Sequence, residues 1–290
     1  MVGSVVLTLS DPDSGTTLEL FNAQSLTDDR SAALDVSPPP GFDSDEPFLT
    51  SLEQGGTVPI QGAVTGPRLA RNANYSSDPI TALAEWAVTF EALVNGGQGD
   101  GYDLTRGYKT GDTFRGMIES ATWVRRGGEP FELGYDLQFV RGQGANIAPP
   151  VSPDAVSPGG DYQLAGETIE TLQELSVTKR QQVQAYRRTF AEDPSDNDLR
   201  ADSGALREIT VSGRVAGDAS TRRAFEQSLQ DSLGQDTLVD FRDAFTGRTY
   251  TGMIDAVAAS DEATQGERLG EFDVAFVEGQ NDGAGGPSRR

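Results

Sequence analysis

The chain has 290 residues, a length that fits one large domain or two of ordinary size. Its 45 acidic and 23 basic residues give a net charge of −22, which argues against a surface that binds nucleic-acid phosphates. It contains no cysteine and no histidine, which excludes disulfides, thiol nucleophiles, histidine-based triads and the usual zinc sites. We therefore expect no enzyme and no catalytic, cofactor-binding or metal site.

The basic residues are almost all arginine, because Lys109 and Lys179 are the only lysines. The acidic residues are spread along the chain between regular apolar positions, which argues against the alternatives of an acidic tail or a disordered chain. Molar salt screens charge repulsion within about 3 Å. This composition is typical of a halophilic protein. No apolar run is long enough for a membrane span, and no signal-peptide pattern is present, so we expect synthesis in the cytoplasm.

The first half is predicted to contain strands, then one helix, then a long hairpin. Alternating apolar and polar residues predict strands at 17–21, 31–37 and 58–64. Apolar residues at helical spacing predict a helix over 81–94 that ends at Asn95-Gly96. The hairpin is predicted to have strands at 113–124 and 131–140, with a turn at 126–130.

The second half is predicted to repeat this order. Strands are expected at 168–172, 182–189 and 209–215, followed by a helix from the N-cap Ser220 to residue 233. A last strand is expected around 272–276, where Phe272, Val274 and Phe276 share one face.

Three sequence blocks recur in the same order in the two halves, which indicates an internal duplication. The clearest spans 111–118 and recurs at 247–254 with five of eight residues identical, including Gly-Met-Ile. The segment 135–143 recurs at 272–280, and 58–66 recurs at 209–217. The sequence thus predicts two tandem domains, at 1–147 and 161–281, with a Pro/Gly linker at 148–160 and a flexible tail at 282–290.

Strand pairs, a central helix and a long hairpin, with the whole unit doubled, resemble the tail-tube superfamily of tailed viruses. The resemblance extends from about residue 5 to residue 280 and includes tube proteins and the tube-like domains of baseplate hubs. It implies a mainly β (α+β) fold of two tail-tube-like β-sandwich or barrel domains, each with one helix and a long hairpin. With the halophilic composition, the chain looks like a tail protein of a haloarchaeal virus.

The resemblance implies a structural virion protein that assembles into hollow rings and functions in genome ejection. Tube rings are typically built from six one-domain subunits, so a two-domain chain implies a homotrimer with pseudo-six-fold symmetry, stacked into a tube. An acidic lumen would let DNA pass without specific binding. Implied partners are other tail proteins, namely the tape measure, the terminator and the baseplate, with no membrane.

Two other functions remain open at this level. One is a baseplate hub or distal-tail adaptor at the tube end, and the other is a non-viral binding module of two β domains. The segments 67–79 and 260–268, which differ between the halves, are either ring contacts or solvated loops. The glycine-rich segment 96–101 follows a helix and is interpreted as a connector. The residues Asp11, Asp13 and Glu19 do not have the spacing of a calcium loop, and the acidic segments 43–46 and 192–198 are interpreted as solvated loops.

Overall fold

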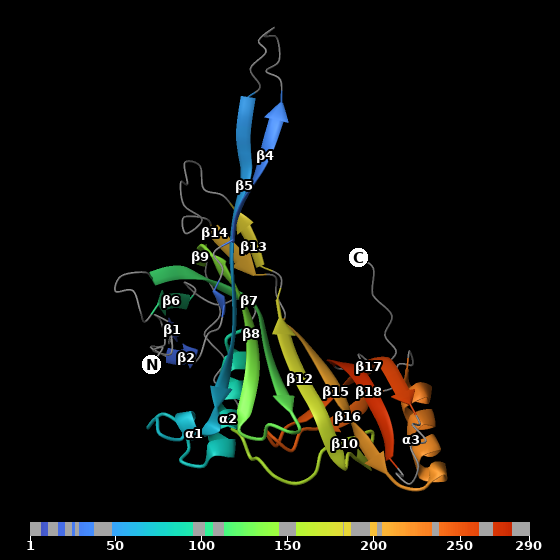
Figure 1. The fold of residues 1–290 in the computed structure, drawn as a ribbon. Coiled ribbons are helices and arrows are strands. Elements are labelled where there is room, and N and C mark those ends of the chain that lie inside the picture. The colour runs from blue at the N-terminus through green and yellow to red at the C-terminus, as the bar shows by residue number, and fades with distance from the viewer. Residues whose placement is uncertain are drawn as a thin grey trace, which may run out of the picture.

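The computed structural model describes residues 7–10, 17–20, 25–26, 29–37, 48–94, 102–106, 113–144, 155–181, 183–186, 198–201, 205–233, 238–260 and 269–279. Within these ranges the protein is mainly β, as the sequence predicts. Fifteen described strands form one large antiparallel sheet, and the helices are few (Figure 1).

The strands of the first half follow a single order in the sheet, β2–β1–β6–β7–β8–β5, with β3 and β4 on the far edge of β5. Their bounds are β1 Leu7–Ser10, β2 Thr17–Leu20, β3 Ser25–Leu26, β4 Asp29–Ser37, β5 Phe48–Thr65, β6 Tyr102–Arg106, β7 Thr113–Arg126 and β8 Glu132–Arg141. The expected strands at 17–21, 31–37, 58–64, 113–124 and 131–140 are confirmed. In Figure 1, β4 and the first part of β5 form a ribbon that projects away from the other strands.

The strands of the second half follow the corresponding order, β11–β10–β16–β17–β18–β15–β12. Their bounds are β10 Gln163–Leu164, β11 Glu167–Thr168, β12 Thr171–Arg180, β15 Leu206–Ala216, β16 Val239–Arg242, β17 Thr249–Ser260 and β18 Leu269–Glu278. The predicted strand at 168–172 is divided between β11 and β12. A separate small sheet contains β13 Val183–Tyr186, β14 Asp198–Ala201 and β9 Gln143–Gly144, so the strand expected at 182–189 pairs outside the large sheet.

The strand registers of the two halves correspond residue by residue. Val58 lies opposite Phe139 in the first half, and Ile209 lies opposite Phe276 in the second. The third strand continues the match, because Ile118 also faces Phe139, Ile254 also faces Phe276, and a bulge follows each isoleucine. The sequence blocks that recur along the chain therefore occupy equivalent places in the sheet.

A close backbone contact accounts for the glycine of the repeated Gly-Met-Ile motif. A Cβ atom built on Gly116 would lie 2.2 Å from the Val140 carbonyl oxygen. A Cβ atom on Gly252 would lie 2.0 Å from the carbonyl oxygen of Val277, at the equivalent point. Each glycine is needed because any side chain would push the neighbouring strand away.

Three helices are described: α1 Gly66–Leu69, α2 Pro79–Ala92 and α3 Ala219–Ser232. The helix expected at 81–94 is confirmed as α2, which begins two residues earlier. The N-cap of α3 is Asp218, so the prediction of Ser220 is wrong. The Asp218 carboxylate accepts a hydrogen bond from the Thr221 amide at 2.9 Å, and the Ser220 hydroxyl donates to the same oxygen.

The two long helices cover the same face of the sheet and differ in burial. Trp86 of α2 packs on Tyr135 of β8, and Phe225 of α3 packs on Phe272, the equivalent residue of β18. Eight residues of α2 are buried, around most of its circumference. Among the residues of α3 whose burial is described, 220–232, only Phe225 and Leu229 are buried, so its outer side is open to solvent.

The predicted linker at 148–160 is described from residue 155, and that part packs on the second half. The Ser157 amide donates to the Thr246 carbonyl at 3.0 Å, and the Gly159 amide donates to the Ala244 carbonyl at 2.9 Å. The tail at 282–290, the glycine-rich segment 96–101 and the loop 261–268 lie outside the described residues.

Candidate functional site: an internal sheet junction and two open edges

The two halves are joined edge to edge by β7 and β12. These strands pair antiparallel, with Arg180 opposite Ser120 and Thr178 opposite Thr122. The two threonine hydroxyl oxygens lie 2.9 Å apart, and the Gln181 side chain donates to the Ile118 carbonyl at 2.6 Å. The sequence predicts two tandem β-sandwich or barrel domains. In the structure, the strands of both halves other than β9, β13 and β14 belong to one sheet, because β12 pairs with the open edge of β7.

A tight turn of the second half, residues 243–248, packs on the first half beside this junction. The Phe245 ring meets Trp123 of β7 edge to face at a centroid distance of 5.7 Å. The Arg125 guanidinium lies over the Phe245 ring, 4.4 Å from the ring centroid. Aromatic pairs of this kind contribute about 1 kcal/mol beyond the area they bury.

Asp243 holds this turn in shape from inside the protein. Its carboxylate accepts hydrogen bonds from the Phe245 amide at 2.8 Å and from the Thr246 hydroxyl at 2.6 Å. Burial raises the pKa of Asp243 to about 6, and the hydrogen bonds oppose that rise without cancelling it. The turn that presents Phe245 therefore depends on a fully buried carboxyl group.

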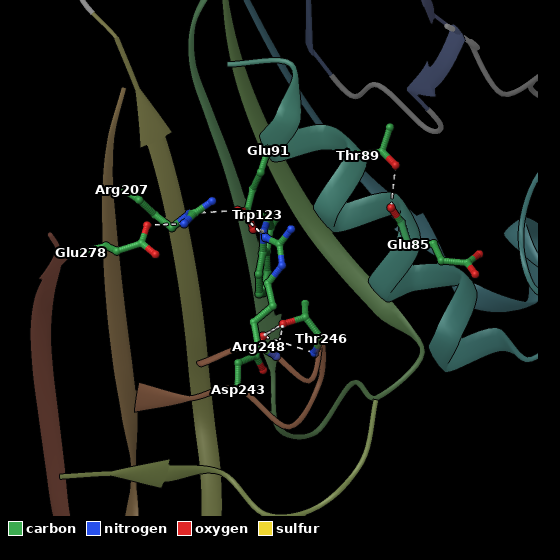
Figure 2. Close-up of polar contacts among 9 residues, drawn as sticks. All are labelled: Glu85, Thr89, Glu91, Trp123, Arg207, Asp243, Thr246, Arg248 and Glu278. Atoms are coloured by element: carbon green, nitrogen blue, oxygen red, sulfur yellow. Dashed lines mark hydrogen bonds and ion pairs between the residues drawn. The ribbon is translucent and has the colours of Figure 1, made fainter. Parts of the chain in front are cut away.

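A buried carboxylate, Glu91 near the end of α2, links the first half to the second (Figure 2). It is 1% exposed and accepts a hydrogen bond from the Trp123 indole at 2.6 Å. Its other oxygen lies 3.0 Å from Nε of Arg207 on β15 and 3.4 Å from Nη1 of Arg248. Glu91, Trp123, Arg207 and Arg248 are called the Glu91 cluster below.

Further charges surround the Glu91 cluster. Arg207 also pairs with Glu278 of β18, and its guanidinium lies 5.3 Å from the centre of the Tyr250 ring. Burial and the nearby Arg207 charge lower the pKa of Lys179. The cluster is a set of ion pairs inside the protein, which suits a structural connection between the halves.

No group of three acidic residues that could hold a metal ion occurs among the described residues. No catalytic residue is expected from the sequence, and no sequence pattern indicates that Glu91, Arg207 and Arg248 interact. The sequence contains one signal that could have identified Glu91 as a buried, paired residue. Glu91 is a charged residue within the apolar pattern that predicts the helix.

The joined halves form a row of strands in the order β17–β18–β15–β12–β7–β8–β5 and then β3 and β4. On the side of β17 that faces away from β18, only 249–252 are paired, with β16. In the described part of the chain, 256–260 have no partner on that side, and β3 and β4 pair with β5 alone. The row therefore ends in an unpaired edge at each end.

Comparison with known proteins gives no assignment: no protein-family model matches the chain, and no curated protein matches its sequence. Among the described helices, none has both the length and the apolar character needed to cross a membrane.

Proposed function

We propose that this protein is a structural subunit that assembles through its open sheet edges into a hollow ring, as the tail-tube subunit of a haloarchaeal virus. In this proposal, 1–147 and 161–281 are tandem tube-like domains. One observation carries it: the chain already contains one complete copy of the contact that assembly requires, between β7 and β12. The two open edges are the equivalents of the two strands that make this contact.

The strand registers specify how a second copy would pair. Arg180 of β12 lies opposite Ser120 of β7. Ser31, opposite Gly55 in the first half, takes the place of Arg180. Ala256 takes the place of Ser120, because both follow the bulge of their strand. The contact between copies therefore places Ser31 of one chain opposite Ala256 of the next.

The contact is head to tail, because the edge at β3 and β4 differs from the edge at β17. Contacts of this kind build a ring when the rotation between copies closes, and closure pairs both of these open edges. Each chain carries one junction inside and makes one junction with its neighbour. If both have the same geometry and the ring has six domains, as the tail-tube resemblance implies, three chains give a ring with pseudo-six-fold symmetry.

The face of the sheet opposite the helices is suited to line a channel. Asp136 of β8 and Asp273 of β18 occupy equivalent positions there, since their neighbours along each strand are buried. Thr122 and Ala258 lie opposite these two aspartates and expose no basic group. Arg126, Arg180 and Arg214 share this face, and each pairs with a glutamate there. The channel proposal therefore relies on Asp136 and Asp273, whose charges would repel phosphate so that DNA passes without binding.

Paired cysteines test the proposed register, because the natural chain has no cysteine. The Gln181 amide donates to Glu119 and the Gly127 amide to Gln173, which makes Arg180–Ser120 a pair without mutual hydrogen bonds. The Cα atoms of such pairs lie about 4.5 Å apart, within disulfide range. The double variant Ser31→Cys/Ala256→Cys, oxidised in molar salt, should form cross-linked chains up to a closed trimer.

The matched control is Ser31→Cys/Ala258→Cys, which moves one cysteine two residues along the same edge and should cross-link far less. Electron microscopy of the unmodified protein in molar salt should show three-fold rings stacked into hollow tubes. Monomers at high concentration, or equal cross-linking of both variants, would refute the proposal. Rings that never stack would place the protein at the end of a tube.

A further inference from the structure

The methionine of the repeated Gly-Met-Ile motif is buried in the first half and exposed in the second. Met117 of β7 lies opposite Val140 of β8, and these residues are only 3% and 8% exposed. Their equivalents, Met253 of β17 and Val277 of β18, also lie opposite each other, but Met253 is 36% exposed and Val277 is half-buried. Both pairs lie on the face opposite the helices, because the isoleucine after each methionine belongs to the core. Met253 and Val277 are called the Met253 patch below.

In the first half, the small sheet covers the methionine. Val183 of β13 packs on Met117 and Val140. β13 begins shortly after β12 ends at Arg180, the residue that lies opposite Ser120 at the junction. The cover of Met117 therefore comes from the half whose edge strand pairs with β7, and it belongs to the same junction.

The β4–β5 ribbon of the first half is the equivalent of the β13–β14 hairpin of the second. Ser31 of β4 takes the place of Arg180, as the strand registers show. The chain after Arg180 leaves the large sheet and forms β13, which pairs with β14. The chain after Ser31 stays in β4, which pairs with the first part of β5. A bulge between Ala33 and Leu34 lies where β12 and β13 are separated, and bulges bend a strand.

The proposed ring brings this ribbon to the Met253 patch of the next chain. At the internal junction, the covering residue comes three positions after Arg180, and the covered methionine three positions before Ser120. In the proposed contact Ser31 lies opposite Ala256, and Met253 again precedes Ala256 by three positions. The part of β4 beyond its bulge would therefore reach the patch.

The register of the ribbon gives it an apolar face. Alternate positions of β4 and the positions opposite them on β5 share a face, which places Leu34, Val36 and Leu49 together with Ser51. The other face carries Asp35, Ser37, Thr50 and Phe48. The first of these faces suits an apolar surface, and the flexible methionine side chain can adapt to either aliphatic partner.

We propose that the Met253 patch is a docking surface for a second copy of this chain, whose β4–β5 ribbon covers it. The inference rests on the proposed ring assembly and names the contact that fastens the paired edges. It gives a reason for the recurrence of the methionine in both halves. Met117 is covered from within the chain, and Met253 is covered by the neighbouring copy.

A double-mutant cycle tests the contact from both sides. Met253→Asp puts a charge on the patch, and replacing 34–52 by an Asn-Gly turn shortens the ribbon while keeping the Ser31 edge. Each change should weaken ring association by about tenfold or more, measured by sedimentation in molar salt, because a buried unpaired charge or a lost cover is costly. Combined, they should weaken it little more than the larger single effect, because both act on one contact. Phe131→Asp, the same charge at an exposed apolar residue elsewhere, is the matched control and should leave association unchanged.

A second pair of variants separates docking from packing within the chain. Met117→Ala should lower the melting temperature of the unassembled chain, because Val183 and Val140 pack on Met117. Met253→Ala should lower it much less and should weaken ring association instead. If Met253→Ala destabilises the unassembled chain as much as Met117→Ala does, the methionine serves its own half and the inference is refuted.

The outcomes also separate this inference from the ring proposal. If Ser31→Cys/Ala256→Cys never cross-links, the ring proposal fails first. If that pair cross-links and Met253→Asp leaves association unchanged, only the docking surface is refuted. Multiplicative effects in the cycle, or a loss from Met253→Asp without a loss from the shortened ribbon, would assign the patch to another occupant and overturn the inference. Leu34→Asp/Val36→Asp replaces the shortened ribbon in the cycle if that chain does not fold.

Discussion

The Glu91 cluster gives the sharpest test of how the two halves are held together. Replacing Glu91 by glutamine keeps the size of the side chain and an oxygen that can accept from the Trp123 indole. The change removes the charge that lies 3.0 Å from Arg207 and 3.4 Å from Arg248. Breaking a buried ion pair from one side costs about 3–5 kcal/mol. Because Arg207 keeps its second partner, Glu278, we expect the lower end, about 3 kcal/mol.

The free energy of unfolding is measured by urea denaturation in molar salt, with Glu208→Gln as the matched control. Glu208 pairs with Arg180 on the solvent-exposed face, where side chains are 35% and 54% exposed, and such pairs contribute about 0–1 kcal/mol. Salt screens the exposed pair further and affects the buried cluster less. If Glu91→Gln costs no more than Glu208→Gln, the cluster does not hold the junction.

Two further predictions concern the turn and the repeated motif. Asp243 has a pKa of about 6, above its usual 3.8, so its ionisation disfavours the folded state, and its contribution to stability falls as pH rises from about 4 to 6. The stability of the natural protein relative to Asp243→Asn should therefore drop by about 3 kcal/mol over that range and then level off, and a flat difference in paired denaturation curves would contradict this. Gly252→Ala should destabilise the fold by about 1–3 kcal/mol, because its Cβ would meet the Val277 carbonyl, whereas Gly128→Ala, with open space around it, should change melting little.

The sequence predicted most of the regular elements, because their signals are local. Alternation identified the hairpin strands, and the recurring glycine, methionine and isoleucine identified positions that the register later showed to be equivalent. The helix over 81–94 was recognisable from its apolar spacing. The N-cap of α3 was misplaced because Asp218 and Ser220 are both good caps, and only the geometry shows which side chain reaches the Thr221 amide.

The junction could not be predicted, because it depends on contacts between residues far apart in the chain. The pairing of β7 with β12 has no local signal, since an edge strand and an internal strand can have the same alternating sequence. Glu91, Trp123 and Arg248 approach each other only once the second half lies on the first.

The differences between the two halves explain what a duplicated chain gains over a one-domain subunit. The residue equivalent to Arg207 in the first half is Gly56, so the Glu91 cluster cannot form at a junction between chains. The junction inside the chain never has to open, so it can bury charges and a tryptophan. A junction between chains forms from exposed surfaces, where buried charges would first have to lose their water. In the proposed ring, covalent linkage of two domains thus allows alternate junctions to specialise, which six identical one-domain subunits could not do.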